Sequence, residues 1–308
     1  MKFPVRILLT ILGFLLVVGF SCNSKNDDIP KDVIDPTDTI KPIDTTDNTV
    51  KLDTVVFSVI GDVPYDSEQR DGLIAMIQEH NTKGTTSEFV VHVGDIKPGA
   101  DPCDEAVYQD INGILKEFST PTFMVLGDNE YNDCNDPPAA LQLWNQYFLN
   151  FHQNWTFDQD ISYQANRAEN FAWVQDKVMF MGLNLVGSEV HDQDEWDTRL
   201  VDNGTFLRDF VAAHRDSSQA LVIFGHANMI ELGAGKFETF TDVMRSVAAG
   251  FEKPVLYMQG DAHFWFLNRP YEEQNILRVQ IEGGANAVQV TVNPNLDQPF
   301  SFDRNFLD

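Results

Sequence analysis

From residue 53 onward the chain repeats one pattern: a short apolar run, then glycine, then aspartate or histidine. The copies are TVVFSVIGD, EFVVHVGD, TFMVLGD, ALVIFGH and VLYMQGD, and they end at Asp62, Asp95, Asp128, His226 and Asp261. Continuous runs of β-branched and aromatic residues are typical of strands buried on both faces. We expect each glycine to let the backbone turn sharply as it leaves its strand.

Amphipathic segments lie between these runs. Residues 104–118 and 67–80 each place apolar side chains on one helical face, and Ser67 is the expected N-cap of the second segment. The first three strand ends are spaced by 33 residues, which is the length of a βαβ unit. Right-handed crossovers make such strands parallel, so their carboxyl ends share the edge where α/β sheets bind ligands. The sequence therefore predicts an α/β fold in which the five polar side chains converge.

A single Gly-Asp pair indicates only a turn, but five copies at strand ends have a chemical consequence. Four carboxylates crowded together repel one another, raise one another's pKa values and destabilise the fold. Divalent cations remove that conflict. The repeat therefore predicts a metal site.

The N-terminal residues have a different character. Lys2 and Arg6 precede an apolar run of 14 residues, Ile7 to Phe20, which is shorter than the roughly 20 residues of a membrane span and typical of a signal peptide. Ser21 and Cys22 then resemble the lipobox of bacterial lipoproteins, in which the cysteine is lipidated. A plain secretory signal with an incidental Cys22 is the alternative, and we favour the lipoprotein.

Residues 23–52 contain no aromatic residue and are rich in Asp, Thr, Pro and Lys, which predicts a disordered tether. The chain thus divides into a signal peptide (1–22), a tether (23–52) and one folded domain (53–308). We expect an exported protein that is anchored by lipid at Cys22 to the outer membrane or cell surface.

The net charge and the cysteine content indicate which partners and which covalent links this chain can have. The net charge of −26, without Lys/Arg clusters, argues against a nucleic-acid-binding face. In an exported chain, the remaining pair, Cys103 and Cys134, predicts a disulfide. A two-thiolate metal site is the alternative, but the pair lacks CxxC spacing.

Over roughly residues 54–292, these motifs resemble the calcineurin-like metallophosphoesterases, whose motifs run D-x-H, G-D, G-N-H-[DE], a later G-H, and G-H-x-H. "HVGDIKPG" and "GDNEYNDC" also resemble a subgroup that carries GDNEW-DC. The resemblance implies an α/β sandwich of mixed sheets flanked by helices, with two divalent metal ions about 3.5–4 Å apart. It also implies that Asp95 bridges the metals, within a ligand set of Asp62, Asp95, Asp128, His226, Asp261 and His263.

Two departures from the family motifs concern the metals. Pro64 replaces the histidine of D-x-H, and the adjacent Tyr65 is a candidate to fill the gap or to contact substrate, although it does not match the tyrosine position of purple acid phosphatases. Asp128 and Asp261 stand where the family has neutral ligands. Two dications would then leave a site of zero net charge, and its oxygen-rich ligand set favours Mn²⁺, Mg²⁺ or Ca²⁺ over Zn²⁺.

A third departure concerns catalysis. Asn129 replaces the histidine that protonates the leaving group in the family, and an amide can donate a hydrogen bond but no proton. His191 is a candidate acid, with a solvated loop histidine as the alternative. Glu130 is expected behind the ligands. Lys97 is expected either to contact the substrate phosphate or to be a solvated loop lysine.

Together these features predict a monomeric phosphomono- or diesterase that acts on a phosphorylated small molecule or extracellular substrate. The resemblance implies that a hydroxide bridging the two metals is the nucleophile. The alternative is a surface-anchored binding protein that keeps the fold and has lost catalysis, which Pro64 and Asn129 favour.

Overall fold

The computed structural model describes residues 54–187, 189–233 and 235–308. The predicted signal peptide with its lipidation site Cys22, and the predicted tether 23–52, lie outside the described residues. Among the helices of the described part, none is both long enough and apolar enough to cross a bilayer.

Two mixed sheets form the centre of the domain. The first has the strand order β12-β11-β1-β2-β3 and contains β1 (Val55–Ile60), β2 (Val90–His92), β3 (Thr122–Met124), β11 (Val288–Val292) and β12 (Phe300–Asp303). The second has the order β4-β5-β6-β7-β8-β10-β9 and contains β4 (Ser162–Gln164), β5 (Arg167–Gln175), β6 (Val178–Gly182), β7 (Ala220–Phe224), β8 (Val255–Gln259), β9 (Phe266–Asn268) and β10 (Ile276–Gln280).

The central strands of both sheets are parallel, and antiparallel strands complete the edges. β1, β2 and β3 pair in parallel, as the spacing of 33 residues predicts, and so do β6, β7, β8 and β10. The runs that end at His226 and Asp261 belong to the second sheet, so the five motifs approach the site from two sheets.

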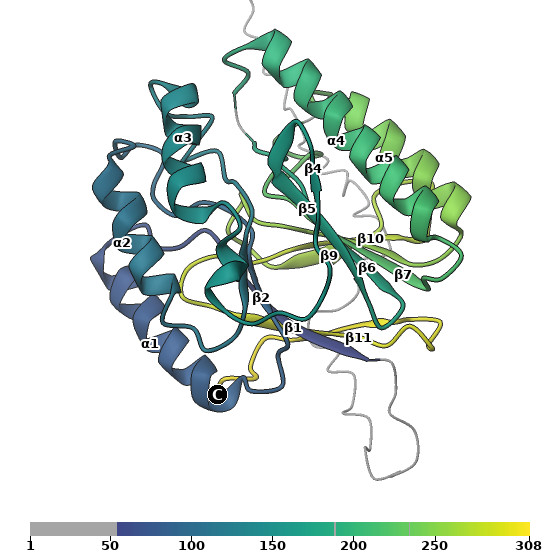
Figure 1. The fold of residues 1–308 in the computed structure, drawn as a ribbon, viewed down its shortest axis with the longest axis horizontal. Helices are drawn as coiled ribbons and strands as arrows, with labels where there is room; N and C mark the ends of the chain where they lie inside the picture. The colour runs from purple at the N-terminus through teal and green to yellow at the C-terminus, as the bar shows by residue number, and fades with distance from the viewer. Residues whose placement is uncertain (1–53, 188, 234) are drawn as a thin grey trace, which may run out of the picture. The chain divides into compact units, whose positions relative to one another are not determined.

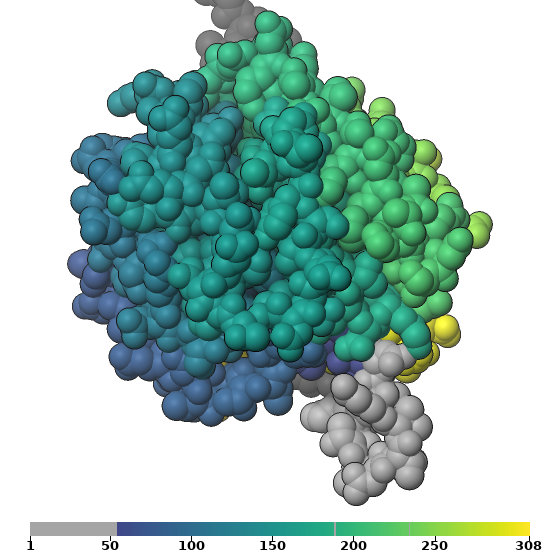
Figure 2. Space-filling view, in the orientation of Figure 1, coloured from purple at the N-terminus to yellow at the C-terminus, as the bar shows by residue number. Residues whose placement is uncertain are grey.

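Helices cover the outer face of each sheet, as Figure 1 shows for α1 (Ser67–Lys83), α2 (Glu105–Leu115) and α3 (Pro137–Phe148) on one side and α4 (Gln193–His214) and α5 (Glu238–Phe251) on the other. A 3₁₀ helix, η1 (Phe151–Asn154), follows α3. Figure 2 shows the same face with side chains filled in, where the blue part that holds α1 to α3 adjoins the green part that holds α4. The predicted fold class, an α/β sandwich of mixed sheets flanked by helices, is confirmed.

Three apolar clusters account for these layers. One lies between the sheets, where Phe57 of β1 packs edge-to-face against Phe180 of β6 and Phe224 of β7. A second joins the outer face of the first sheet to α1, α2 and α3, and a third joins the second sheet to α4 and α5. Both faces of the central strands are therefore buried, which is why their sequences are almost continuously apolar.

The helix start predicted at Ser67 is wrong by one residue. Asp66 is the N-cap, since its side chain accepts a hydrogen bond from Gln69 N, and Ser67 is the first helical residue. Asp and Ser have similar N-cap preferences, so the local sequence did not separate them. The helix continues to Lys83, whose Nζ donates to Leu307 O, and Figure 1 accordingly shows the C-terminus beside α1.

Candidate metal centre

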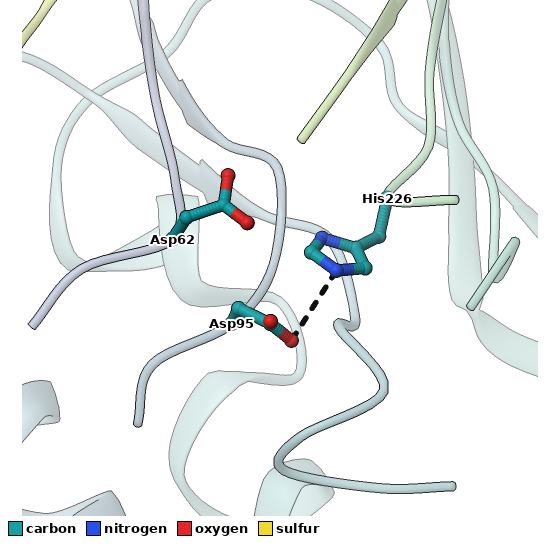
Figure 3. A group of neighbouring side chains, drawn as sticks. All are labelled: Asp62, Asp95 and His226. Atoms are coloured by element: carbon teal, nitrogen blue, oxygen red, sulfur yellow. Dashed lines mark ion pairs between the residues drawn. The ribbon is translucent and has the colours of Figure 1, made fainter. Parts of the chain in front are cut away.

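The five motif side chains lie together at the carboxyl ends of their strands. They form two groups of possible metal ligands, Asp62 with Asp95 and His226, and Asp128 with His226 and Asp261, and within each group the donor atoms lie within 4.8 Å of one another. Figure 3 shows the first group, with the three side chains pointing toward one another. His226 is common to both groups, and Asp95 belongs to the first. The bridging role that the resemblance implies for Asp95 stays a prediction.

His226 is oriented as a metal ligand. Its Nδ1 lies 2.8 Å from Val93 O, and because a carbonyl only accepts, this contact places a proton on Nδ1. Its Nε2 then faces Asp95 Oδ1 at 3.3 Å and Asp128 Oδ1 at 2.9 Å. A neutral imidazole in this position presents a lone pair to two carboxylates, an arrangement that a cation between them would stabilise.

The buried oxygen and nitrogen atoms of these side chains indicate whether metal ions fit between them. Within the described residues, Asp62 Oδ2 is buried without a hydrogen-bond partner, and the buried His226 Nε2 faces the carboxylates of Asp95 and Asp128. Such atoms cost free energy unless another partner compensates them. Carboxylate oxygens and an imidazole nitrogen are also suitable ligands for divalent cations. The residues present therefore fit divalent metal ions.

The pKa values of the groups reflect the crowding of charge. Burial raises the pKa of Asp95 to about 6, and the neighbouring Asp128 and Asp62 add to the effect while His226 opposes it. Burial likewise raises the pKa of Asp261, with Asp128 contributing. Burial lowers the pKa of His226, but Asp95 and Asp128 outweigh it and hold that pKa well above its ordinary value. Without a cation, these raised pKa values favour protonation of the acids and of His226, and the bound protons reduce the repulsion among the carboxylates.

The prediction that the motif glycines themselves make the sharp turns out of the strands is wrong for most of them. Of the five motif glycines, only Gly94 has a positive φ, 95°. The left-handed turn is instead made by the acids themselves, with φ of 51° at Asp62, 62° at Asp95 and 78° at Asp261. Non-glycine residues seldom adopt this region, and strain of this kind is typical of functional sites.

The glycines provide room for the acids of neighbouring strands. A Cβ on Gly127 would lie 2.1 Å from Asp95 N and 2.3 Å from Asp95 Oδ1, and a Cβ on Gly260 would lie 2.3 Å from Asp62 Oδ2. Each glycine thus allows close backbone approach at one strand end to a carboxylate from another. This requirement depends on the packing of strands, so the repeat alone did not reveal it.

The side-chain amide of Asn129 is hydrogen-bonded to other residues of the site. Its Nδ2 donates to Asp95 Oδ2, to Lys97 O at 3.0 Å and to Tyr65 OH at 2.8 Å. The phenol of Tyr65 in turn donates to Asp95 Oδ2 and lies 3.2 Å from His263 Nε2. Burial, followed by the charge of Asp95, raises the pKa of Tyr65, so its hydroxyl is neutral. Asn129 and Tyr65 together hold one carboxylate oxygen of Asp95.

Glu130 lies behind the candidate ligands, as expected. It is fully buried, and its carboxylate accepts hydrogen bonds from Gly127 N at 2.6 Å and from Asp95 N and Ile96 N at 3.3 Å. Burial raises its pKa to about 8, and Asp95 adds to the shift. Glu130 therefore ties together the loops that follow β2 and β3.

His263 and Lys97, two other candidate residues, are both held by hydrogen bonds beside the candidate metal ligands. His263 lies outside both groups, with Nε2 3.3 Å from Asp62 Oδ1, and this hydrogen bond raises its pKa. Lys97 is buried, which contradicts the solvated-loop alternative, and its Nζ donates to Pro98 O at 3.0 Å and Asp101 O at 2.8 Å.

His191 is 41% exposed and lies 3.6 Å from Asp133. Asp133 N donates to Asp128 O, and Asn132 Nδ2 donates to Glu189 O. These contacts bring the loop that carries His191 next to the loop that follows β3. His191 is therefore near the centre without belonging to either group.

Cys103 and Cys134 form the predicted disulfide, which closes a sequence separation of 31 residues. Each sulfur lies 3.6 Å from Asn129 O. The bridge thus joins the loops after β2 and β3 on either side of the Asn129 main chain.

Two positions outside the motifs also orient the candidate ligands. Gly283, with φ of 75°, packs against Asp62, since a Cβ there would lie 2.7 Å from Asp62 Cβ, and Gly284 N donates to Asp62 O at 2.9 Å. The Gly-Gly pair after the run ILRVQ was the signal for it. Asn228 N donates to Asp261 Oδ2 at 2.8 Å, and its only signal was its place two residues after His226.

The fold of two mixed sheets flanked by helices is similar to that of solved phosphatase structures. A dimetal phosphatase from Danio rerio has a TM-score of 0.53 at 14% identity, over 80% of this chain and 98% of that chain. A purple acid phosphatase from yellow lupin has a TM-score of 0.51 at 11% identity, over 82% of this chain and 55% of that chain.

The Plasmodium protein GAP50, described as the anchor in the inner membrane complex, has a TM-score of 0.50 at 12% identity, over 82% of this chain and 88% of that chain. At these identities the likeness establishes a common fold. No family model and no curated protein sequence matches the chain.

Proposed function

We propose that this chain hydrolyses phosphate esters with the help of two divalent cations. The observation that carries the proposal is the pair of overlapping acid–histidine groups at the strand ends of a fold that dimetal phosphatases share. The groups include Asp62 Oδ2, a buried carboxylate oxygen that has no hydrogen-bond partner among the described residues and that suits a cation.

Asp62 and Asp95 would hold one cation, with His263 turned toward Asp62 as a further ligand. Asp128, His226 and Asp261 would hold the other. When bound, the cations would acidify the attacking water and stabilise the negative charge that develops on the phosphate oxygens. With oxygen as the dominant donor, we favour Mn²⁺, Mg²⁺ or Ca²⁺ over Zn²⁺.

The surrounding side chains would orient the ligands and handle protons. Asn129 and Tyr65 would keep Asp95 in one orientation, and Glu130 would hold the main chain beneath it. Asn129 cannot donate a proton, so His191, oriented by Asp133, is the proposed acid for the leaving group. General-acid assistance contributes about 10²–10⁴ in rate, so loss of His191 should slow esters with poor leaving groups far more than esters with good ones.

One experiment tests this function. The full-length protein, loaded with Mn²⁺, is assayed against aryl phosphate mono- and diesters of increasing leaving-group pKa. We expect turnover that Asp95→Asn abolishes and that the exposed Asp158→Asn retains, and we expect it to fall more steeply with leaving-group pKa in His191→Ala than in the wild type. Tight Mn²⁺ binding without turnover of any ester would contradict the proposal.

A binding protein without catalysis is the second candidate. Pro64 and Asn129 favour it, because neither can supply the nitrogen ligand or the proton expected from the resemblance. The related fold of a Plasmodium anchor is in keeping with such a role. Metal binding with no turnover across the ester panel is the result that this candidate predicts.

For the cellular setting, we propose an exported, monomeric lipoprotein that is anchored through Cys22 to the outer membrane or cell surface and acts on phosphorylated small molecules or extracellular substrates. The evidence is the apolar run, the Ser21–Cys22 junction and the acidic composition of the chain. Replacing Cys22→Ala should release the protein from the membrane fraction, which immunoblotting of fractionated cells measures. Retention of the variant in that fraction would exclude the lipid anchor.

A further inference from the structure

Strand β10 carries two buried polar side chains, although no candidate ligand lies on it. Arg278 is 1% exposed and Gln280 is fully buried. They are two residues apart on one strand, so they face the same side of the sheet. Burial removes the hydrogen bonds that such polar groups make with water, and this costs free energy unless the protein supplies other partners. Both side chains therefore need hydrogen-bond partners inside the fold.

The side-chain amide of Gln280 has three partners. Its Oε1 accepts from Asn228 Nδ2 at 3.0 Å and from Gln259 Nε2 at 2.9 Å. Its Nε2 donates to Phe264 O at 2.9 Å. One side chain thus connects the loop after β7 with the segment after β8.

Two of these three contacts lead directly to candidate ligands. Asn228 donates its main-chain N–H to Asp261 Oδ2 at 2.8 Å. Phe264 follows His263 in the chain, so its carbonyl belongs to the turn that presents the histidine. The positions of Asp261 and His263 therefore both depend on groups that Gln280 holds.

Arg278 contacts the same two segments. Its guanidinium forms two 2.7 Å hydrogen bonds with Glu231 in the loop after β7, and it stacks over the ring of Phe266 at 4.7 Å. It also donates to Asn268 Oδ1 at 3.1 Å. This face of β10 is therefore a rigid support for both loops, and Gln280 is the end of it nearest the metal centre.

We propose that Gln280 is a positioning residue that sets the affinity of the cation group of Asp128, His226 and Asp261. The inference rests on cation binding, which is one part of the proposed function, and it does not require turnover. Hydrogen-bond partners behind metal ligands typically contribute 10–100-fold to metal affinity. Loss of the Gln280 contacts removes one hydrogen bond from Asn228 and one from the Phe264 carbonyl. Asp261 in this group and His263 beside Asp62 are then held less firmly.

A matched pair of variants tests this role. Gln280→Met keeps the volume of the side chain and removes all three hydrogen bonds. Gln259→Met makes the same chemical change on the neighbouring strand, where, among the described residues, the side chain of Gln259 hydrogen-bonds with Gln280 and its Oε1 has no partner. Mn²⁺ is titrated into each full-length protein by calorimetry, and urea unfolding in EDTA reports the stability of the cation-free fold.

We expect two binding phases in the wild type, and in Gln280→Met a dissociation constant 10–100-fold larger in one phase, with a smaller increase in the other because His263 is only a further ligand there. Gln259→Met should stay within about threefold of the wild type. Asn228→Ala, which breaks the same connection from the other end, should also weaken one phase and keeps the proposal testable if Gln280→Met does not fold.

Several results would overturn the inference. Wild-type affinities in both Gln280→Met and Asn228→Ala would exclude it, as would equal losses in Gln280→Met and Gln259→Met. A chain that binds no divalent cation would overturn both the inference and the proposed function. Normal Mn²⁺ binding by the wild type without ester turnover, together with a weakened phase in Gln280→Met, would remove the function alone and support the inference.

Discussion

Gly127 has no side chain, and the metal centre depends on that absence. Its position where β3 leaves the sheet lies against Asp95, so a Cβ added there would come within 2.1 Å of Asp95 N, 2.3 Å of Asp95 Oδ1 and 2.9 Å of Asp95 Cα. Two of these atoms are backbone, so a side-chain rotation cannot relieve the contact. Gly127→Ala therefore has to displace the turn at Asp95 or the loop after β3.

The required displacement is about 1 Å, since real Cβ atoms do not approach other atoms closer than 3.0 Å. Overpacking a tightly packed site costs about 1–3 kcal/mol. The same movement stretches the 2.6 Å bond from Gly127 N to Glu130 and shifts Asp95 away from His226. We therefore expect Gly127→Ala to lower the free energy of unfolding by about 2–3 kcal/mol and to abolish high-affinity Mn²⁺ binding.

Urea unfolding in EDTA and in Mn²⁺ measures both effects, and Gly113→Ala is the control. Gly113 lies in α2, where a Cβ would meet no atom within 4 Å. Alanine there should stabilise the chain by about 0.5–1 kcal/mol through its helix propensity and leave Mn²⁺ binding unchanged. If Gly127→Ala is as stable as the wild type and binds Mn²⁺ equally well, the close-approach argument is refuted.

Three further predictions address other parts of the chain. Cys103→Ser opens the 31-residue loop that ends at Cys134 and should cost about 3–4 kcal/mol in urea unfolding, whereas a wild type that is equally stable with and without reductant would contradict the loop-closure argument. Burial lowers the pKa of His80 to about 4 from an ordinary value of 6.5, so the unfolded chain binds a proton first and the contribution of His80 to stability should fall by about 1.4 kcal/mol per pH unit from pH 6.5 toward 4. Unfolding at several pH values should show a shallower slope for His80→Gln than for the wild type, and identical slopes would count against this assignment. Asp261→Asn relieves repulsion among buried carboxylates, so it should stabilise the chain in EDTA and destabilise it relative to the wild type in Mn²⁺; a change of the same sign in both conditions would rule out a cation ligand.

The architecture was predictable because it follows from local pattern. Continuous apolar runs that end in Gly-Asp or Gly-His marked β1, β2, β3, β7 and β8, and the spacing of 33 residues indicated parallel pairing of the first three. Helices were located by their apolar periodicity, although α2 is shorter than the predicted 104–118 and α1 begins after Asp66. Capping residues with similar preferences compete at a helix start, so its boundary is a weaker prediction than its existence.

Features of the site that depend on contacts between distant strands were not predictable. Asn129 lies beside its motif acids in the sequence, yet its amide is directed to Asp95, Tyr65 and Lys97 O, which come from other loops. Gln280 belongs to a run without any motif residue, and its partners lie 16, 21 and 52 positions away. No local pattern encodes such pairings, because they form only when strands that are distant in the sequence are assembled into the sheets.

The sequence by itself determined which residue types end the strands, and therefore that acids and a histidine meet at the edge of parallel sheets. Only the tertiary structure decided how they meet: two sheets bring His226 between two acid groups, and the acids adopt the left-handed turns while the glycines make room for them. The physical reason is that strand formation depends on neighbours along the chain. Close approach, burial and charge depend on neighbours in space, and those are set by how the two sheets pack.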